Sequence, residues 1–501
     1  MPIRITIGDE EHYLATLDDL LAVENFVSET QAQALNAAEQ VRLLKLQHES
    51  LSADVKALLA GIEPAPIIIE DDSEPIYDGI IVGPGDNLQE AILDAGGQQI
   101  YLKDGDYKPF QVVSDTRIKA MSEHAAVVSG LVPWHTGWVK SGNAWYKDLN
   151  VQMYQHPANA VHSENGSPSA RGLAHRRAMQ PHMLVWGEEP MQPVYVAADL
   201  VAGTFMLEGT SSSPKGIWAR FPDDQAPQEG MVYFSPYQNL IKGKTADVDG
   251  VVLDGLGVRY CSNTGTFGAI QMEMGHEYWQ LLNLGITDSM SEGIRLRGSN
   301  HLVQSCSFEH HGHVGIAGQG LFRSQLIDCV SNFNVWRHGV DPLWHAGGLK
   351  WQYGCNENFI QNYRAVGNDG AGFWLDIWNQ DNVIDGFELL NNSTFGMHIE
   401  HHSKGTIVKN GLIKSTRKFN GIGSGLQIQG AIEGCHFNNI IIEDNEDGAV
   451  YYKKEGDPRG NSGGNTFEAI IHRNNGNNNR WGIQGDVNNM PDTYTRMNVP
   501  E

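Results

Sequence analysis

The sequence has 501 residues, of which 41% are apolar, so it is long enough for two or three domains or for one long solenoid. Its formal net charge of −25 argues against binding to nucleic acid or to an anionic membrane surface, since both need a basic surface. No stretch approaches the roughly 18 apolar residues of a membrane span, and the five cysteines lack the spacing of a disulfide framework or metal site. We therefore expect no nucleic-acid partner, no membrane insertion and reduced thiols.

Residues 1–63 are expected to form a coiled coil for oligomerisation or attachment. Apolar positions alternate at spacings of three and four from Leu20 to Ile62, giving about six heptads with no Pro or Gly before Gly61. One long amphipathic helix packed on the body is the alternative. The opening residues lack the basic and apolar regions of a signal peptide, so we expect the chain to fold in the cytoplasm.

The middle of the chain is expected to begin a solenoid and then to interrupt it. Residues 64–84 are predicted as a linker and first strand, and residues 85–130 as an amino-terminal cap with a short helix marked by Leu88 and Ile92. Residues 131–245 are rich in Trp, Pro and His, and their strand-like runs separated by turn residues predict a small inserted β domain. The solenoid then continues over 246–475 and is followed by a polar tail, 476–501.

A repeat identifies the solenoid type. Six segments begin with Gly and alternate inward and outward positions, several of their starts lie 22 to 24 residues apart, and a second strand-like run follows each. The segments start at Gly293, Gly315, Gly348, Gly372, Gly396 and Gly425. Asn and Gly cluster at the corners, where left-handed backbone conformations are needed. This pattern predicts an all-β fold dominated by a parallel β-helix; a leucine-rich repeat has a similar period but needs a regular Leu/Asn pattern that is absent here.

The predicted register places two columns of side chains on the outside of one sheet. The first column reads Arg295, Ala317, Lys350, Trp374, His398 and Gln427. The second reads Arg297, Gln319, Gln352, Asp376, Glu400 and Gln429. Stacked strands lie about 4.8 Å apart, so Asp376 and Glu400 should be direct neighbours. Two unpaired carboxylates at that distance should repel and raise the pKa of one of them, unless a cation binds between them.

These columns supply the candidate site. The catalytic candidates are Asp376, Glu400, Lys350 and His398. The substrate-binding candidates are Trp374, Trp378, Arg297, Gln352, His401 and His345. In the run GFWLDIW, Trp374, Asp376 and Trp378 are predicted to form the exposed half, with the Trp rings stacking on sugars. The competing interpretation is that outward residues of a β-helix are polar simply because water surrounds them.

Two mechanisms are compatible with these residues. In a hydrolase, Asp376 and Glu400 would serve as acid and as nucleophile or base, with the outcome set by their separation. In a lyase, Lys350 or His398 would abstract a proton next to a uronate carboxylate. Arg297, or a Ca²⁺ ion held by the two acidic residues, would neutralise that carboxylate. No other cofactor is expected.

Two regions resemble a broad group of bacterial and phage right-handed β-helix repeat proteins, many of them linked to polysaccharide lyases or hydrolases. One is the insert, through segments such as Trp145-Tyr146 and the run from Ile217 to Arg220. The other is the run 345–405, which is similar to a pattern of Gly-Gly-x-Lys, Gly-x-Trp-x-Asp and Gly-x-x-x-Glu on successive coils. The matching residues are Lys350, Trp374, Asp376 and Glu400; His345 stands near the place where that pattern often has an acidic residue. The resemblance implies a right-handed helix, an embedded β domain and work on carbohydrate.

The combination of an amino-terminal coiled-coil rod, no signal peptide and a β-helix body also resembles phage tail fibres and tailspikes. This resemblance implies a homotrimer joined by the amino-terminal coiled coil, attached to other phage tail proteins in the virion and directed at a host surface polysaccharide. Such a protein would be assembled in the host cytoplasm. The alternatives are a bacterial polysaccharide lyase or glycoside hydrolase outside any virion, and a structural adhesin without catalysis.

Overall fold

The computed structural model describes residues 3–7, 10–14, 77–149, 182–210, 213–337, 340–453, 463–476, 481–484 and 493–496. The chain divides into two compact units, Met1–Ile76 and Tyr77–Glu501. In the first unit, strands β1 (Ile3–Ile7) and β2 (Glu10–Leu14) form an antiparallel pair that the heptad pattern did not predict. The predicted coiled coil over residues 20–62 lies outside the described residues.

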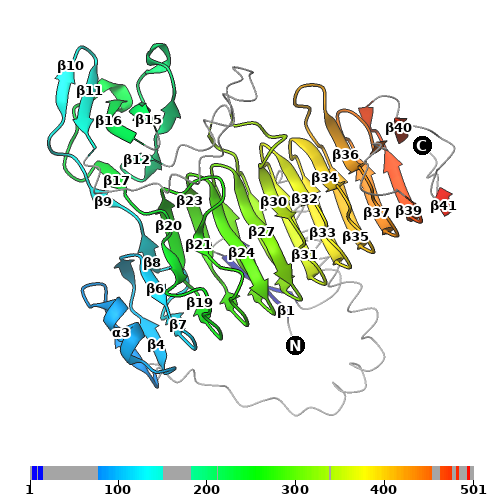
Figure 1. Ribbon diagram of the computed structural model, residues 1–501, viewed down its shortest axis with the longest axis horizontal. Coiled ribbons are helices and arrows are strands. Elements are labelled where there is room, and N and C mark those ends of the chain that lie inside the picture. The colour runs from blue at the N-terminus through cyan, green and yellow to red at the C-terminus, as the bar shows by residue number, and fades with distance from the viewer. Residues whose placement is uncertain are drawn as a thin grey trace. The chain divides into compact units, whose positions relative to one another are not determined.

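The second unit contains parallel strands stacked as successive coils of a β-helix (Figure 1). One sheet has eleven strands, and their order in space follows the chain. They are β6 (Phe110–Val112), β18 (Ile241–Gly243), β21 (Gly268–Gln271), β24 (Glu292–Ser299), β27 (Val314–Phe322), β30 (Gly347–Gln352), β32 (Ala371–Asp376), β34 (Thr394–Glu400), β36 (Gly423–Gln429), β38 (Val450–Lys453) and β40 (Trp481–Gln484). The prediction of an all-β parallel helix is therefore confirmed for these coils.

A second sheet of nineteen strands forms the other sides of the coils. Its strands are β3 (Ile80–Val82), β4 (Gln99–Leu102), β5 (Gly105–Tyr107), β7 (Arg117–Ala120), β8 (Ala126–Ser129), β19 (Val252–Asp254), β20 (Gly257–Cys261), β22 (Gln280–Leu282), β23 (Gly285–Ser289), β25 (Leu302–Gln304), β26 (Ser307–Glu309), β28 (Gln325–Ile327), β29 (Val330–Asn332), β31 (Phe359–Val366), β33 (Val383–Leu390), β35 (Ile407–Lys414), β37 (His436–Glu443), β39 (Thr466–Arg473) and β41 (Thr493–Arg496). Earlier coils carry two short strands each, whereas β31 is long enough to pair with both β28 and β29.

The register within the eleven-stranded sheet is the predicted one. Along one inward column, Ile316 pairs with Leu349, Leu349 with Phe373, Phe373 with Met397 and Met397 with Leu426. All five side chains are fully buried in one hydrophobic core shared by the coils. Each packs against the same position one coil away, about 4.8 Å along the stack, so every coil completes the core of its neighbours.

Asparagine contributes to the corners in two ways. Asn362 and Asn410 have positive φ, as predicted for left-handed corners. A second set of asparagines is buried and forms a ladder of hydrogen bonds from coil to coil. The side-chain oxygen of Asn368 accepts the backbone N–H of Asn334 at 2.9 Å, and the side-chain amide of Asn368 donates to Asn392 Oδ1 at 2.8 Å. This ladder satisfies backbone groups that a buried turn would otherwise leave unpaired. The sequence predicted only the first role.

Helix α3 (Leu88–Asp94) precedes β4, where the sequence predicted a cap helix. Leu88 and Ile92 are buried in the same core as the coils, and the Asn87 side chain accepts the backbone N–H of Glu90 at the amino-terminal end of the helix. All five cysteines are buried free thiols. Within the described part of the chain, no helix is long and apolar enough to cross a membrane.

Two small sheets occupy the segment between the first coils and the main body of the helix. The five-stranded sheet contains, in spatial order, β10 (Val139–Ser141), β11 (Ala144–Asp148), β16 (Ser213–Arg220), β15 (Thr204–Thr210) and β14 (Gln192–Val194). The four-stranded sheet contains β13 (Glu189–Pro190), β12 (Met183–Trp186), β17 (Val232–Ser235) and β9 (Val132–Pro133). Two 3₁₀ turns, η2 (Ala197–Asp199) and η3 (Pro222–Asp224), lie among these strands.

The four-stranded sheet lies between the β-helix and the five-stranded sheet. Met183 and Val185 on β12 pack against Tyr260 and Met290 of the coils. The alternate side chains of β12 join a separate core that is shared with the five-stranded sheet and includes Phe205. Because side chains alternate along a strand, one face of this sheet packs on the β-helix and the other face packs on the five-stranded sheet.

Candidate active site

The outward columns predicted from the sequence are present on β30, β32 and β34. Lys350 pairs in register with Trp374, and Trp374 pairs with His398. Asp376 and Glu400, two positions after Trp374 and His398, end β32 and β34. One oxygen of Asp376 and one of Glu400 lie within 4.8 Å of each other. The predicted neighbouring carboxylates on adjacent coils therefore exist.

These side chains are far less exposed than the sequence predicted. Lys350, Trp374 and His398 are each 3% exposed, and Asp376 and Glu400 are each 8% exposed. Outward side chains of this sheet were expected to be exposed to solvent. Instead all five are buried, and the two carboxylates are the most exposed of them.

Neighbouring loops provide the cover over Trp374. Its ring belongs to an apolar cluster with Ala371 and Phe395, against which Leu343 and Ile422 pack. Leu343 precedes β30 and Ile422 precedes β36, so both come from connections rather than from the strands. The predicted role of Trp374 as an open stacking surface for sugars is therefore wrong, because loops bury the ring.

Lys350 is held by three acceptors. Its Nζ lies 3.1 Å from Asp376 Oδ2, donates to the carbonyl oxygen of Trp344 at 2.5 Å, and stands 3.3 Å from the centroid of the Trp374 ring. An ammonium satisfies all three contacts, through an ion pair, a hydrogen bond and a cation–π interaction. A neutral amine would leave the Asp376 carboxylate without its counter-ion. This geometry does not suit the predicted role of Lys350 as a proton-abstracting base.

Glu400 has its own partners. Trp374 Nε1–H donates to Oε2 at 2.8 Å, His401 Nε2 lies 2.8 Å from Oε1, and His398 Nδ1 lies 3.6 Å from Oε2. Burial raises the pKa of Glu400, but the charge interaction with His398 and the hydrogen bond with His401 outweigh it and lower that pKa to about 2. The sequence predicted that two unpaired carboxylates at this distance would raise the pKa of one of them. Glu400 is paired with hydrogen-bond donors, and its pKa is lowered instead.

The His398 ring is buried and packs against two aromatic rings. Its ring centroid lies 4.9 Å from that of Trp374 and 4.4 Å from that of Phe395, and burial lowers its pKa. Neither ring nitrogen has a hydrogen-bond partner in the described part of the chain. At 3% exposure the imidazole cannot reach a substrate at the surface, so the structure does not support the predicted role of His398 as a base.

Asp376, Glu400 and His401 form a group that can be tested as a metal site. One donor atom from each lies within 4.8 Å of the other two. Ca²⁺ takes six to eight oxygen ligands, and this group offers two carboxylates and one imidazole. Lys350 already neutralises Asp376. The residues therefore do not fit the Ca²⁺ ion considered for a lyase.

Arg297 and Gln352 occupy different places relative to the carboxylates. Gln352 pairs in register with Asp376 and is partly exposed, so it lies beside that residue on the next strand. Arg297 lies on β24, three strands from β32, a separation on the order of 14 Å. It pairs with Glu273 at 3.1 Å and donates to Gln319 at 2.6 Å. The structure therefore does not bring Arg297 to the two carboxylates, and its predicted role in neutralising a uronate there is not supported.

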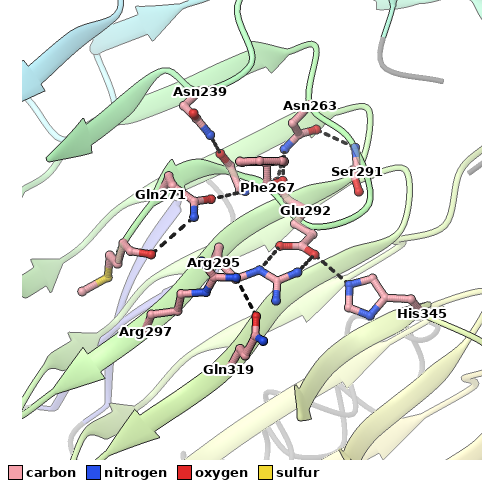
Figure 2. Close-up of polar contacts among 12 residues, drawn as sticks. Asn239, Asn263, Phe267, Gln271, Ser291, Glu292, Arg295, Arg297, Gln319 and His345 are labelled. Carbon is pink, nitrogen blue, oxygen red and sulfur yellow. Dashed lines mark hydrogen bonds and ion pairs between the residues drawn. The ribbon is translucent and has the colours of Figure 1, made fainter. Parts of the chain in front are cut away.

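His345 belongs to a second buried charge network. Its Nε2 lies 2.7 Å from Glu292 Oε1, and the Glu292 carboxylate also receives two hydrogen bonds from the Arg295 guanidinium (Figure 2). Burial raises the pKa of Glu292, but Arg295 and His345 outweigh it and hold that pKa below its ordinary value. The network ties the loop before β30 to β24. The predicted outward column included Arg295, but alternation along β24 assigns Glu292 to the opposite face, so the register did not predict their contact.

Two aromatic residues at the corners that follow the strands of the site are exposed. Trp378 is 47% exposed, as predicted for a stacking residue, and Tyr353, which was not predicted, is also 47% exposed. Ile377 and Trp378 have φ values of 53° and 60°, and His401 has 43°. Trp378 N–H donates to the carbonyl oxygen of His401 at 2.9 Å, so the corner is linked across the two coils. Left-handed backbone at non-glycine residues recurs at many corners of the described coils, so these values belong to the β-helix fold.

Comparison with known proteins supports the fold. Residues 268–429 match the family model described as right handed beta helix region, so this part of the chain is a right-handed parallel β-helix. A search among curated proteins found no match.

Several solved structures are similar to this chain at low sequence identity. The complex of XylC with xylose is 13% identical, with a TM-score of 0.56 over 74% of this chain and 66% of that chain. The catalytic domain of a GH87 alpha-1,3-glucanase variant with nigerose is 12% identical, with a TM-score of 0.46 over 87% and 70% of the two chains. The pre-mature bacteriophage phi29 gene product 12 is 10% identical, with a TM-score of 0.43 over 78% and 49%. The likeness to XylC concerns the fold, and we draw nothing from the two lower scores.

Proposed function

We propose that this protein is a glycoside hydrolase that acts on a polysaccharide through Asp376 and Glu400. The observation that carries the proposal is the carboxylate pair itself. Two acidic side chains on adjacent coils have oxygens within 4.8 Å, and at 8% exposure each they are the most exposed members of a buried group. Trp378 and Tyr353, which follow β32 and β30, offer exposed rings for the apolar faces of sugars.

Hydrolysis suits this site better than lyase chemistry. A lyase needs a base and a cationic group that neutralises the uronate. Lys350 is engaged with Asp376 and Trp344, His398 is buried, and Arg297 lies three strands away. Lys350 already pairs with Asp376, so no lysine or arginine of this group is left to neutralise a uronate. A neutral sugar needs no such partner.

The separation of the carboxylates favours a retaining mechanism, for which a spacing of about 5 Å is typical. In the first step, the ionised Asp376, held by Lys350, attacks the anomeric carbon. The glycosidic C–O bond breaks, and the leaving oxygen takes a proton from the Glu400–His401 pair, in which Oε1 and Nε2 are 2.8 Å apart. In the second step the pair removes a proton from water. The resulting hydroxyl displaces Asp376, and both groups return to their starting state.

The test is a panel of neutral and anionic polysaccharides treated with the wild type, Asp376→Asn and Glu400→Gln. Xylans are the first neutral probes, because XylC, which has the same fold, was solved with xylose. We expect new reducing ends without the absorbance of unsaturated uronates, and a loss of about 10³-fold or more in each variant. Glu388→Gln is the matched control, because Glu388 pairs with Arg364 on the exposed surface of the next sheet.

Other outcomes would contradict the proposal. Absorbance from unsaturated uronates would indicate a lyase. Cleavage activity that is retained by both Asp376→Asn and Glu400→Gln would mean that the active site lies elsewhere. Binding without cleavage on every polysaccharide would leave a structural adhesin.

We also propose that residues 20–62 assemble the chain into a homotrimer that serves as a phage tail fibre or tailspike facing a host surface polysaccharide. The support is the uninterrupted heptad pattern ahead of a β-helix. Light scattering of the full chain should give three times the mass of one chain. A Pro at Leu44, within the heptads, should abolish association, because Pro breaks a helix. A monomeric wild type would contradict the proposal and favour an enzyme outside any virion.

A further inference from the structure

The five-stranded sheet of the insert has one face in a core and one face outside it. Trp145 and Leu207 pack into the core shared with the four-stranded sheet. The side chains that alternate with them, Tyr146 and Met206, must point to the opposite face. Neither the proposed active site nor the β-helix uses this second face.

An apolar row crosses all five strands on that face. The register pairs Val139 with Tyr146, Tyr146 with Trp218, Trp218 with Met206, and Met206 with Val194. Val139 is 66% exposed, and the other four are partly exposed. The rings of Tyr146 and Trp218 lie 4.8 Å apart between centroids. We call these five side chains the insert row.

Two carboxylates border the aromatic part of the row. Asp148 and Glu208 stand two positions beyond Tyr146 and Met206, so they lie on the same face. Tyr146 Oη–H donates to Asp148 Oδ1 at 2.9 Å, and Trp218 Nε1–H donates to Glu208 Oε2 at 2.8 Å. These bonds hold each ring by its polar edge. A carboxylate has about four acceptor sites, so both acids can accept further hydrogen bonds.

The absence of a side chain at Gly216 leaves room for the Tyr146 ring. This glycine lies directly between Asp148 and Glu208 in the register. A Cβ added at Gly216 would stand 2.4 Å from Tyr146 Oη and 2.5 Å from Cζ. The ring therefore lies over the backbone of Gly216, and any larger residue would displace it.

We propose that the insert row, with Asp148 and Glu208, is a second and non-catalytic binding site for a neutral polysaccharide. Adjacent rings with exposed area and fixed polar edges suit the C–H faces of sugar rings, and the acids suit their hydroxyl groups. The two acids and the overall charge of −25 disfavour anionic glycans and anionic membranes. Arg220, the cation on this face, is bound by Asp224 at 2.8 Å. The proposal does not depend on cleavage at Asp376.

The test is affinity electrophoresis of the full chain through gels containing arabinoxylan, glucomannan or dextran, with alginate and polygalacturonate as anionic probes. The background carries Asp376→Asn and Glu400→Gln, so the probes are not consumed. We expect retardation by at least one neutral polysaccharide. Trp218→Ala and Gly216→Ala should weaken it about tenfold, as is typical for truncating an aromatic anchor, while Trp218→Phe should retain most of it.

Phe333→Ala is the matched control, because Phe333 is a 58% exposed aromatic residue of the β-helix. Thermal unfolding of each variant reports whether it folds, and Gly216→Ala keeps the test informative if Trp218→Ala does not fold. Retardation that is unchanged in the folded members of the pair Gly216→Ala and Trp218→Ala would overturn the proposal. So would an absence of retardation by every neutral probe, or stronger binding to the anionic ones.

Discussion

Replacing Glu400 by Gln should change how the stability of the protein depends on pH. The pKa of Glu400 is lowered from 4.5 to about 2 by its donors. Ionised Glu400 therefore stabilises the fold at pH values above 4.5, and this contribution is lost as the pH falls from 4.5 towards 2. A shift of that size corresponds to roughly 3 kcal/mol at neutral pH and to about half of that or less at pH 3.

The assay is urea unfolding of the wild type and Glu400→Gln at pH 7, 5 and 3. The variant should be less stable by about 3 kcal/mol at pH 7, and the gap should shrink to about half or less at pH 3. Glu388→Gln is the control, because its partner Arg364 is 3.1 Å away but both side chains are partly exposed. Such surface pairs contribute about 0–1 kcal/mol. A gap between wild type and Glu400→Gln that stays constant with pH would refute the reasoning about Glu400.

Three further substitutions have expected outcomes. Lys350→Met should cost about 3–5 kcal/mol of unfolding free energy, because the buried Asp376 then loses its counter-ion; a change of less than about 1 kcal/mol in urea unfolding would contradict this. Trp378→Ala should raise KM for a polysaccharide about tenfold while the thermal midpoint changes little, because the ring is 47% exposed; equal losses in kcat and stability would argue for a structural role instead. Asn368→Ala should lower the free energy of unfolding by about 3 kcal/mol through unpaired buried groups, and a neutral effect in urea unfolding would exclude the ladder as a stabilising element.

The sequence predicted the β-helix and its register because both follow from short-range patterns. Alternation along a strand fixes which side chains face inward, and the spacing of the Gly starts fixes which residues stack. Phe373 therefore pairs with Met397 as expected. The same logic placed the two carboxylates on adjacent coils.

Burial of the site was not predictable from those patterns. Leu343 and Ile422 cover Trp374, although each lies more than one strand away in the sequence. The stacking of Lys350 over Trp374 depends on that cover, since the loop also supplies the Trp344 carbonyl group. Contacts between a strand and a distant loop carry no periodic signal. Exposure and pKa values therefore had to come from the structure.

The stereochemistry of the first product tests the central claim most directly. NMR of the product formed in the first minutes of cleavage by the wild type reports the anomeric configuration before it equilibrates. With carboxylate oxygens within 4.8 Å, Asp376 and Glu400 should give net retention. Inversion would require room for a water between them and would contradict the proposed roles of both residues.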